Sequence, residues 1–288
     1  MNPYIQSLRL RTLPLSVSGI ILGAGVALSH PSEAITAQQW WVFALAICTT
    51  LSLQILSNLC NELGDAQKGT DADQRGRAAY GLQAGTMTQA QIKKEIALFA
   101  GLCVVFGVAL IRVSFGTLCC LQSAIFIGLG ALAIAGAVKY TLGKHSYGYI
   151  GLGDLGVFVF FGLLSTIGAY YLLTQHVTWE VVWYGVAVGL PCVGVLNLNN
   201  IRDMANDRKH GKHTLASLLG PTGARIYHTL LLVGCLTIMV AYGHLWCLCI
   251  VPVWGWHLWY LWSHTTKLDK QMPVLMFTTL IVVLLALI

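Results

Sequence analysis

Acidic side chains are scarce in this chain, which contains 11 Asp and Glu among 288 residues. Charged residues of both signs make up 10% of the sequence, whereas hydrophobic residues make up 56%. A soluble domain of this length does not need such a large fraction of hydrophobic residues to build its core. The composition therefore excludes an ordinary soluble protein and predicts a polytopic helical membrane protein, all-α in class.

Paired cysteines and clustered basic charge are also missing. Most of the nine cysteines lie inside apolar runs, and no Cys-x-x-Cys pair falls in a polar loop. We therefore infer neither a disulfide framework nor a zinc site, and interpret the cysteines as small buried hydrophobic side chains.

The net charge of +6 is spread over short loops between apolar runs. This distribution argues against nucleic acid as a partner and is typical of membrane topology signals.

Nine apolar runs are long enough to span a bilayer at about 20 residues each. The first follows two arginines and resembles a secretory signal peptide, but the many runs after it favour a retained span. Residues 1–12 are predicted to form a short interfacial helix. The predicted spans cover residues 13–29, 39–60, 95–112, 118–138, 150–173, 179–199, 225–243, 245–262 and 272–288.

Basic residues lie almost entirely on one side of these predicted spans. Every Lys and Arg except Arg112 precedes the first span or falls in a loop on the same side of the membrane. By the positive-inside rule, the N-terminus is then cytoplasmic, and an odd number of spans puts the C-terminus outside. We therefore expect a multi-pass protein of the cell inner (cytoplasmic) membrane.

Six of the acidic residues are concentrated in two stretches, 61–73 and 199–207. Each begins where a predicted span ends, with Asn61-x-x-x-Asp65 or Asn199-x-x-x-Asp203, and a basic, glycine-containing loop follows. Carboxylates near a bilayer are costly and mark functional sites. The repeat predicts a single transmembrane domain over residues 1–288. Its two similar halves would surround a central cavity, and its cytoplasmic motif loops would cover about 61–94 and 200–224.

The spacing within each stretch suits a magnesium site. Residues four apart share a helix face, as Asp203 and Asp207 do. Mg²⁺ prefers one or two carboxylates, completed by phosphate oxygens and water. Two facing surfaces of this kind could hold two ions around a diphosphate, with nearby bases neutralising the remaining phosphate charge. The alternative, a solvated loop whose acids pair with its own bases, is disfavoured because the motif occurs twice on one side. The nearby bases are Lys68, Arg75, Arg77, Arg202, Arg208, Lys209 and Lys212.

These motifs resemble those of the UbiA superfamily of intramembrane prenyltransferases, which has an Asn-Asp-x-x-Asp-type first motif and an Asp-x-x-x-Asp second motif. The runs 8–14, 64–71, 151–154 and 199–215 are similar to the 1,4-dihydroxy-2-naphthoate polyprenyltransferase branch. The resemblance covers nearly the whole chain. Glu62 departs from it by standing where the family usually has Asp. Gly69 stands where many relatives have a third acid, and Asp71 follows two residues later.

The resemblance implies a Mg²⁺-dependent reaction on a polyprenyl diphosphate. Loss of diphosphate gives an allylic cation, the naphthalenediol attacks it at the carbon bearing the carboxylate, and CO₂ leaves, giving demethylmenaquinone. The apolar spans would enclose the isoprenoid tail.

The resemblance also implies roles for individual residues. Implied catalytic residues are Asp65, Asp203, Lys139 and Tyr140. Implied metal ligands are Asn61, Glu62, Asp65, Asp71, Asn200, Asp203 and Asp207. Implied diphosphate contacts are Lys68, Arg75, Arg77, Asn199, Arg202 and Lys212. Implied contacts to the aromatic acceptor are Arg11, Tyr147 and Asp154.

Two alternative functions compete with this interpretation. Within the same class, the acceptor could be another aromatic acid such as 4-hydroxybenzoate. From a different class, a transporter or Mg²⁺ channel with an inverted repeat would place polar residues deep within its spans, near the midplane. The acids of this chain stand at span ends instead, which disfavours transport.

Overall fold

The computed structural model describes residues 3–29, 35–70, 80–264 and 268–288, and every regular element within these ranges is helical. The longer helices are α2 (Leu13–Leu28), α3 (Ala37–Lys68), α4 (Gln89–Phe115), α5 (Leu121–Lys139), α7 (Ser165–Thr174), α8 (Trp179–Lys209), α9 (Leu215–Ala241), α10 (Val251–Ser263) and α11 (Gln271–Leu285). The short ones are α1 (Pro3–Ser7), η1 (Leu10–Thr12), η2 (Tyr147–Tyr149), α6 (Gly153–Val157), η3 (Phe158–Leu164), η4 (Leu245–Ile250) and η5 (Leu268–Lys270).

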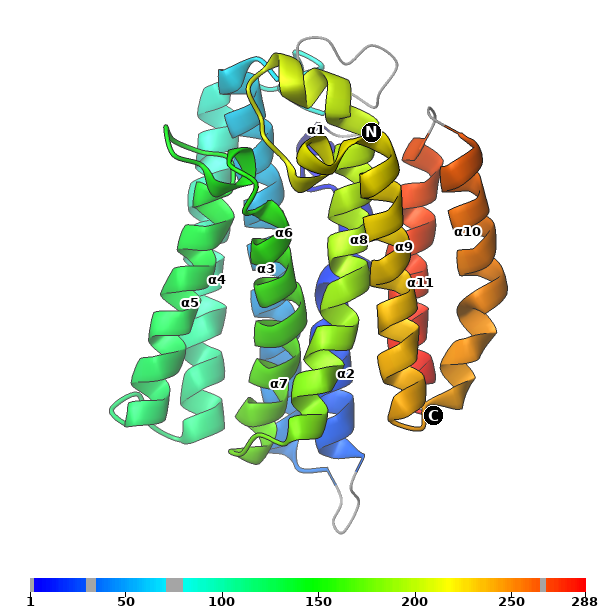
Figure 1. Ribbon diagram of the computed structural model, residues 1–288. Coiled ribbons are helices and arrows are strands. Elements are labelled where there is room, and N and C mark those ends of the chain that lie inside the picture. Colours follow the sequence, from blue (N-terminus) through cyan, green and yellow to red (C-terminus); the bar gives the residue numbers. More distant parts are fainter. Residues whose placement is uncertain (1–2, 30–34, 71–79, 265–267) are drawn as a thin grey trace.

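Within the described ranges, nine helical segments are long and apolar enough to cross a membrane. This confirms the predicted all-α class and number of spans. The segments stand side by side as one bundle, and the two chain termini lie at opposite ends of it (Figure 1). The protein is a multi-pass integral membrane protein.

The two motif-bearing helices are longer than predicted. Helix α3 continues past residue 60 to Lys68, and α8 continues past residue 199 to Lys209. Helix α3 ends where Gly69 forms its C-cap. The backbone of Gly69 is left-handed (φ 71°), a conformation that glycine adopts without strain. The predicted motif loops 61–94 and 200–224 therefore begin as helix, and the motif acids sit on rigid helical ends.

The fifth span is pressed between two neighbours through small residues. Gly23 of α2 lies against Thr166 of α7, where an added Cβ would be 2.1 Å from the Thr166 carbonyl oxygen. On the other side, an added Cβ at Gly162 of η3 would be 2.6 Å from both the carbonyl oxygen of Gly185 and the Cα of Gly189, on α8. Small residues let helix backbones approach closely in lipid, where packing drives association. The η3 segment is a π-helix, a wider turn that shifts the register of the span.

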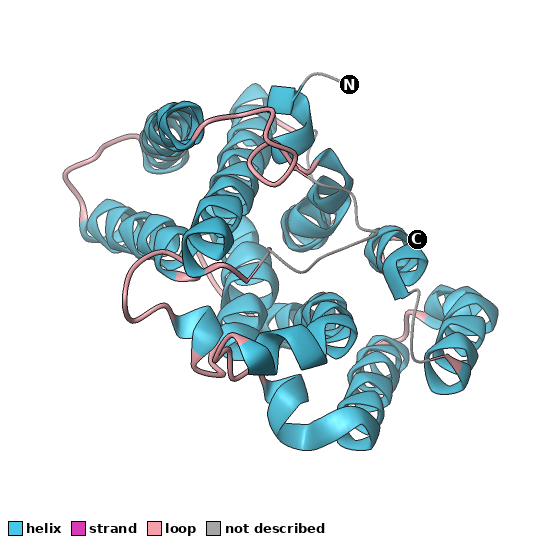
Figure 2. Ribbon diagram, turned by 90° about the horizontal axis from the view of Figure 1, so that it is seen from above, coloured by secondary structure: helices cyan, strands magenta, loops and turns pink. Residues whose placement is uncertain are grey.

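A cavity of about 380 Å³ lies between α2, α3, α4, α5, the fifth span, α8 and α11. Its wall is polar near the end where the motifs lie, with Arg9, Asn58 and Asn61 among its residues. Toward the opposite end it is apolar, with Leu110 and Leu172. Viewed from the motif end, the helices are seen end-on with the connecting loops lying across them (Figure 2).

The close approach at Gly23 generates a test of the packing. Gly23→Ala should destabilise the protein by about 1–3 kcal/mol, because the new Cβ overlaps the α7 backbone. Gly101→Ala is the matched control, since Gly101 is an exposed helical glycine with no atom within 4 Å of an added Cβ. Thermal unfolding in detergent should show a lower midpoint for Gly23→Ala only. Equal midpoints for the two variants would contradict this account.

Candidate functional site

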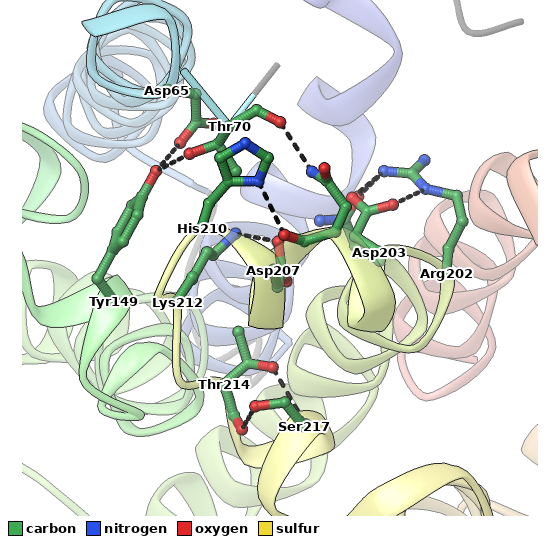
Figure 3. Close-up of polar contacts among 12 residues, drawn as sticks. Asp65, Thr70, Tyr149, Arg202, Asp203, Asp207, His210, Lys212, Thr214 and Ser217 are labelled. Atoms are coloured by element: carbon green, nitrogen blue, oxygen red, sulfur yellow. Dashed lines mark hydrogen bonds and ion pairs between the residues drawn. The ribbon is translucent and has the colours of Figure 1, made fainter. Parts of the chain in front are cut away.

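The ends of α3 and α8 meet at one end of the bundle. Asn206 of α8 donates a hydrogen bond from Nδ2 to the carbonyl oxygen of Thr70, just past the end of α3, at 2.7 Å. The two motifs are therefore in direct contact, although 136 residues separate these partners in the sequence. Figure 3 shows Asp65 on one side of this junction and Asp203 and Asp207 on the other.

The motif acids are crowded and mostly buried. Asp203 and Asp207 are buried, Asp65 is partly buried, and Asp207 is close enough to feel the negative charge of both others. Within the described parts of the two motifs, three buried oxygen atoms have no hydrogen-bond partner: Oε2 of Glu62, Oδ1 of Asn200 and Oδ2 of Asp207. An orphaned buried oxygen is costly, so a ligand that satisfies such atoms is favoured here.

These oxygens fit Mg²⁺ bound together with a phosphate. Among the described residues, no three carboxylate, imidazole or thiol groups form a ready-made metal cluster. A cation at this junction would therefore share carboxylate and amide oxygens with the oxygens of a bound phosphate. That mixed and incomplete protein set is what Mg²⁺ uses, in contrast to metals held in closed protein cages.

Arg202 holds one of the motif acids in place. Its Nε and Nη2 each donate to one carboxylate oxygen of Asp203 at 2.7 Å. Nη2 also donates to Oδ1 of Asn199, and Nη1 donates to Oδ1 of Asp269 on η5, both at 2.6 Å. A two-pronged guanidinium contact fixes the orientation of a carboxylate. Arg202, expected to contact diphosphate, thus orients Asp203 in this structure.

Two lysines expected to contact diphosphate converge on one aromatic ring. Nζ of Lys68 lies 3.6 Å from the ring centroid of Tyr149, and Nζ of Lys212 lies 5.5 Å from it. Lys68 also donates to the Thr141 carbonyl oxygen at 2.7 Å, and Lys212 lies 3.5 Å from Oδ1 of Asp207. The two cations are therefore held next to the motif acids. Tyr149 itself was not among the residues that the sequence singled out.

The remaining expected metal ligands fall in different places. Asn61 lines the cavity and accepts a hydrogen bond from Thr141 at 2.9 Å. Glu62 is fully buried and accepts a hydrogen bond from the backbone N–H of Leu82 at 2.7 Å, so it anchors the segment that precedes α4. Three expected site residues, Asp71, Arg75 and Arg77, lie outside the described residues.

Two tyrosines stand at the cavity wall near the motif end. Tyr140 and Tyr147 both line the cavity, with their rings edge to face at 5.2 Å. Burial raises the pKa of Tyr147 to about 12 and also raises the pKa of Tyr140, so both hydroxyls keep their protons at neutral pH. Of the other expected residues, Lys139 is exposed at the end of α5. Asp154 is buried beside Tyr227 and is not part of the described cavity wall.

Arg9 is a cavity residue that the sequence reasoning missed. Its guanidinium lies 4.1 Å above the ring of Tyr80, and its buried Nε has no hydrogen-bond partner. Its backbone is left-handed (φ 51°, ψ 51°), a strained conformation for a residue with a side chain and one that tends to mark functional sites. Arg11, expected at this place, is exposed and donates to the hydroxyl of Tyr80 instead. The only sequence signal was the position of Arg9 within the 8–14 run.

Comparison with known proteins identifies the family. The sequence model of the UbiA prenyltransferase family matches residues 17–285. The 1,4-dihydroxy-2-naphthoate octaprenyltransferase of Escherichia coli (strain K12) is 40% identical over 263 residues, which cover 88% of this chain and 79% of that protein. The protein of the same name from Mycobacterium tuberculosis is 34% identical, with 85% of this chain and 80% of that protein covered.

Solved structures share the fold. The apo structure of a UbiA homolog from Aeropyrum pernix K1 has a TM-score of 0.62 and 17% identity, covering 95% of this chain and 96% of that one. A UbiA homolog from Archaeoglobus fulgidus bound to DMAPP and Mg²⁺ has a TM-score of 0.60 and 15% identity, covering 99% of each chain. The family match over nearly the whole sequence agrees with the motif resemblance, and the chain belongs to the UbiA prenyltransferase family.

Proposed function

We propose that this protein transfers a polyprenyl group from polyprenyl diphosphate to 1,4-dihydroxy-2-naphthoate, with loss of diphosphate and CO₂, giving demethylmenaquinol, the reduced form of demethylmenaquinone, because the transfer itself involves no oxidant. The observation that carries the proposal is the meeting of two acidic motifs and two lysines beside the polar end of an otherwise apolar cavity. The choice of a naphthoate acceptor is supported by the names of relatives that are 40% and 34% identical to this chain.

The motif junction holds the leaving group in this proposal. Asp65, Asn200, Asp203 and Asp207 would hold Mg²⁺, which neutralises the charge of the departing diphosphate when it is bound. Ammonium groups of Lys68 and Lys212, already next to the acids, donate to the phosphate oxygens. The Archaeoglobus fulgidus homolog was solved with DMAPP and Mg²⁺ together, which supports this pairing.

The cavity receives the isoprenoid tail. Its apolar part, which includes Leu110, Phe126 and Leu172, matches a hydrocarbon chain in chemistry. A water-poor pocket also protects an allylic cation from attack by water before the acceptor reaches it. Tyr140 and Tyr147 line the polar end, where an aromatic π system would stabilise a cation formed beside it.

The acceptor would bind between the tail and Arg9. The unpartnered Nε of Arg9 is a donor for the acceptor carboxylate, and the protonated hydroxyls of Tyr140 and Tyr147 are donors for its oxygen atoms. The electron-rich ring attacks the allylic carbon from the carbon bearing the carboxylate. The electron pair of the bond to CO₂ then returns to the ring as CO₂ leaves.

We place the motif end of the bundle on the cytoplasmic side. All Lys and Arg residues except Arg112 were assigned to one side from the sequence. Helix α1 and the C-terminal ends of α3 and α8 lie at the same end of the bundle, as that assignment requires (Figure 1). A cytoplasmic site would meet soluble naphthoate directly, while the tail stays within the bilayer.

Removing a motif acid should abolish most of the activity. Asp65→Ala and Asp203→Ala should each lower prenyl transfer by at least about 100-fold, the scale of losing a major electrostatic stabiliser. The measurement is product formation by purified protein in detergent at fixed Mg²⁺. Glu180→Gln is the control, because Glu180 is an exposed acid at the start of α8, at the opposite end of the bundle. Near-normal rates in both Asp variants would remove the metal-site model.

Acceptor identity can be tested directly with two aromatic acids. Purified protein given one polyprenyl diphosphate should prenylate 1,4-dihydroxy-2-naphthoate and leave 4-hydroxybenzoate unreacted, as judged by the mass of the extracted product. Turnover of 4-hydroxybenzoate alone would overturn the naphthoate assignment while leaving a prenyltransferase in place.

Arg9 and Arg11 form a matched pair for locating the acceptor carboxylate. Arg9→Ala should raise the KM for the naphthoate about 10- to 100-fold, since a hydrogen bond to a charged group contributes about 1.5–3 kcal/mol. The KM for polyprenyl diphosphate should change little. Arg11→Ala should leave both constants within about two-fold, because Arg11 is exposed and, unlike Arg9, does not line the cavity. Equal effects of the two substitutions would argue against Arg9 as the carboxylate ligand.

A further inference from the structure

Tyr149 contacts the first acidic motif and the loop that follows the second, although it belongs to neither. It ends the short helix η2, between α5 and α6, and its side chain is buried. Its hydroxyl reaches Asp65 and Thr70 at the end of α3, and its backbone carbonyl oxygen accepts from the N–H of His213, beyond the end of α8, at 2.9 Å. Figure 3 shows the ring running from η2 up to Asp65, with Lys212 beside it.

The hydroxyl of Tyr149 has a defined direction. It lies 2.8 Å from Oδ1 of Asp65 and 2.7 Å from Oγ1 of Thr70. An ionised carboxylate can only accept, so the phenol proton points to Asp65 and the Thr70 hydroxyl donates to the phenol oxygen.

The ring of Tyr149 has a separate effect on the two lysines. Nζ of Lys68 is 3.6 Å from the ring centroid and Nζ of Lys212 is 5.5 Å from it. An ammonium group near an aromatic ring face is attracted by the ring quadrupole. Two like charges repel each other, so a shared aromatic surface reduces the cost of holding them together beside the acids.

We propose that Tyr149 is a positioning residue for the diphosphate site: its hydroxyl fixes one oxygen of Asp65 and leaves the other for the cation, and its ring holds Lys68 and Lys212 toward the phosphates. This inference rests on the proposed function, because it assumes that the motif junction binds Mg²⁺ with a diphosphate. It assigns separable roles to the hydroxyl and the ring, which two substitutions distinguish.

Tyr149→Phe keeps the ring and removes only the hydroxyl. Groups that hydrogen-bond to a metal ligand typically change metal affinity by 10- to 100-fold when they are lost. We therefore expect Mn²⁺, used as a spectroscopic substitute for Mg²⁺, to bind about 10- to 100-fold more weakly. Tyr149→Leu also removes the ring and should additionally weaken the binding of a prenyl thiolodiphosphate, a non-reacting substrate analogue, at saturating metal.

The experiment measures binding on the full-length protein in detergent. Mn²⁺ binding is followed by electron paramagnetic resonance with farnesyl thiolodiphosphate present. The transfer rate is measured separately as a function of Mg²⁺ concentration. For Tyr149→Phe, the rate should recover toward wild type at high Mg²⁺, a rescue that general loss of folding does not give. Tyr184→Phe is the matched control: its hydroxyl is also bonded to a carboxylate, Glu180 at 2.6 Å, but near the start of α8.

The outcomes distinguish failure of the proposed diphosphate site from failure of the proposed role of Tyr149. Wild-type protein that binds no Mn²⁺ with the analogue overturns the diphosphate site and Tyr149 with it. Wild-type binding with unchanged affinity in Tyr149→Phe overturns the role of Tyr149 alone. If Tyr149→Phe does not fold, Thr70→Val, which removes the group that donates to the phenol, takes its place. It should weaken Mn²⁺ binding by a few-fold, and unchanged affinity there would again count against the proposal.

Discussion

Carboxylates at the edge of a membrane are costly unless each is matched by a donor or a cation, and the motif end of this bundle is organised by that requirement. Tyr149 donates to Asp65, and Arg202 holds Asp203 with two hydrogen bonds. Tyr149 lies 84 residues from Asp65 in the sequence, and Arg202 also bonds to Asp269, 67 residues away. Neutralising the acids therefore draws the loops of the bundle together, and the same matching prepares an anion site.

The packing of the membrane-spanning helices depends on a different constraint. Lipid offers no hydrophobic reward for bringing helices together, so contact depends on close backbone packing. Gly23 and Gly162 allow α2 and α8 to approach the fifth span from either side, and the cavity lies beside these contacts. Packed walls and a polar entrance put an isoprenoid tail and a charged head group in adjacent environments. This juxtaposition supports a reaction between a membrane-soluble donor and a water-soluble acceptor.

Much of this arrangement could be predicted from the sequence, because hydrophobic run length sets the spans and the Asn-x-x-x-Asp spacing sets which motif residues share a helix face. The spacing of residues along a helix does not determine which partner each side chain contacts. Glu62 lies about 100° around the helix from Asn61, and it is bonded to the backbone of Leu82. Arg9 rather than Arg11 lines the cavity, where the chain takes a left-handed turn at Arg9. Such outcomes depend on partners brought from distant segments, which one sequence does not reveal.

The π-helical segment Phe158–Leu164 makes the fifth span sensitive to chain length. Loops usually accept an inserted or deleted residue, because their ends can adjust. Deleting one residue here would tend to restore an ordinary α-helix and rotate everything beyond it by about 100°. Thr166 would then turn away from Gly23, while Gly162 stayed against α8. Natural variation in length should therefore collect in the connecting loops of this protein and be absent from the middle of its fifth span.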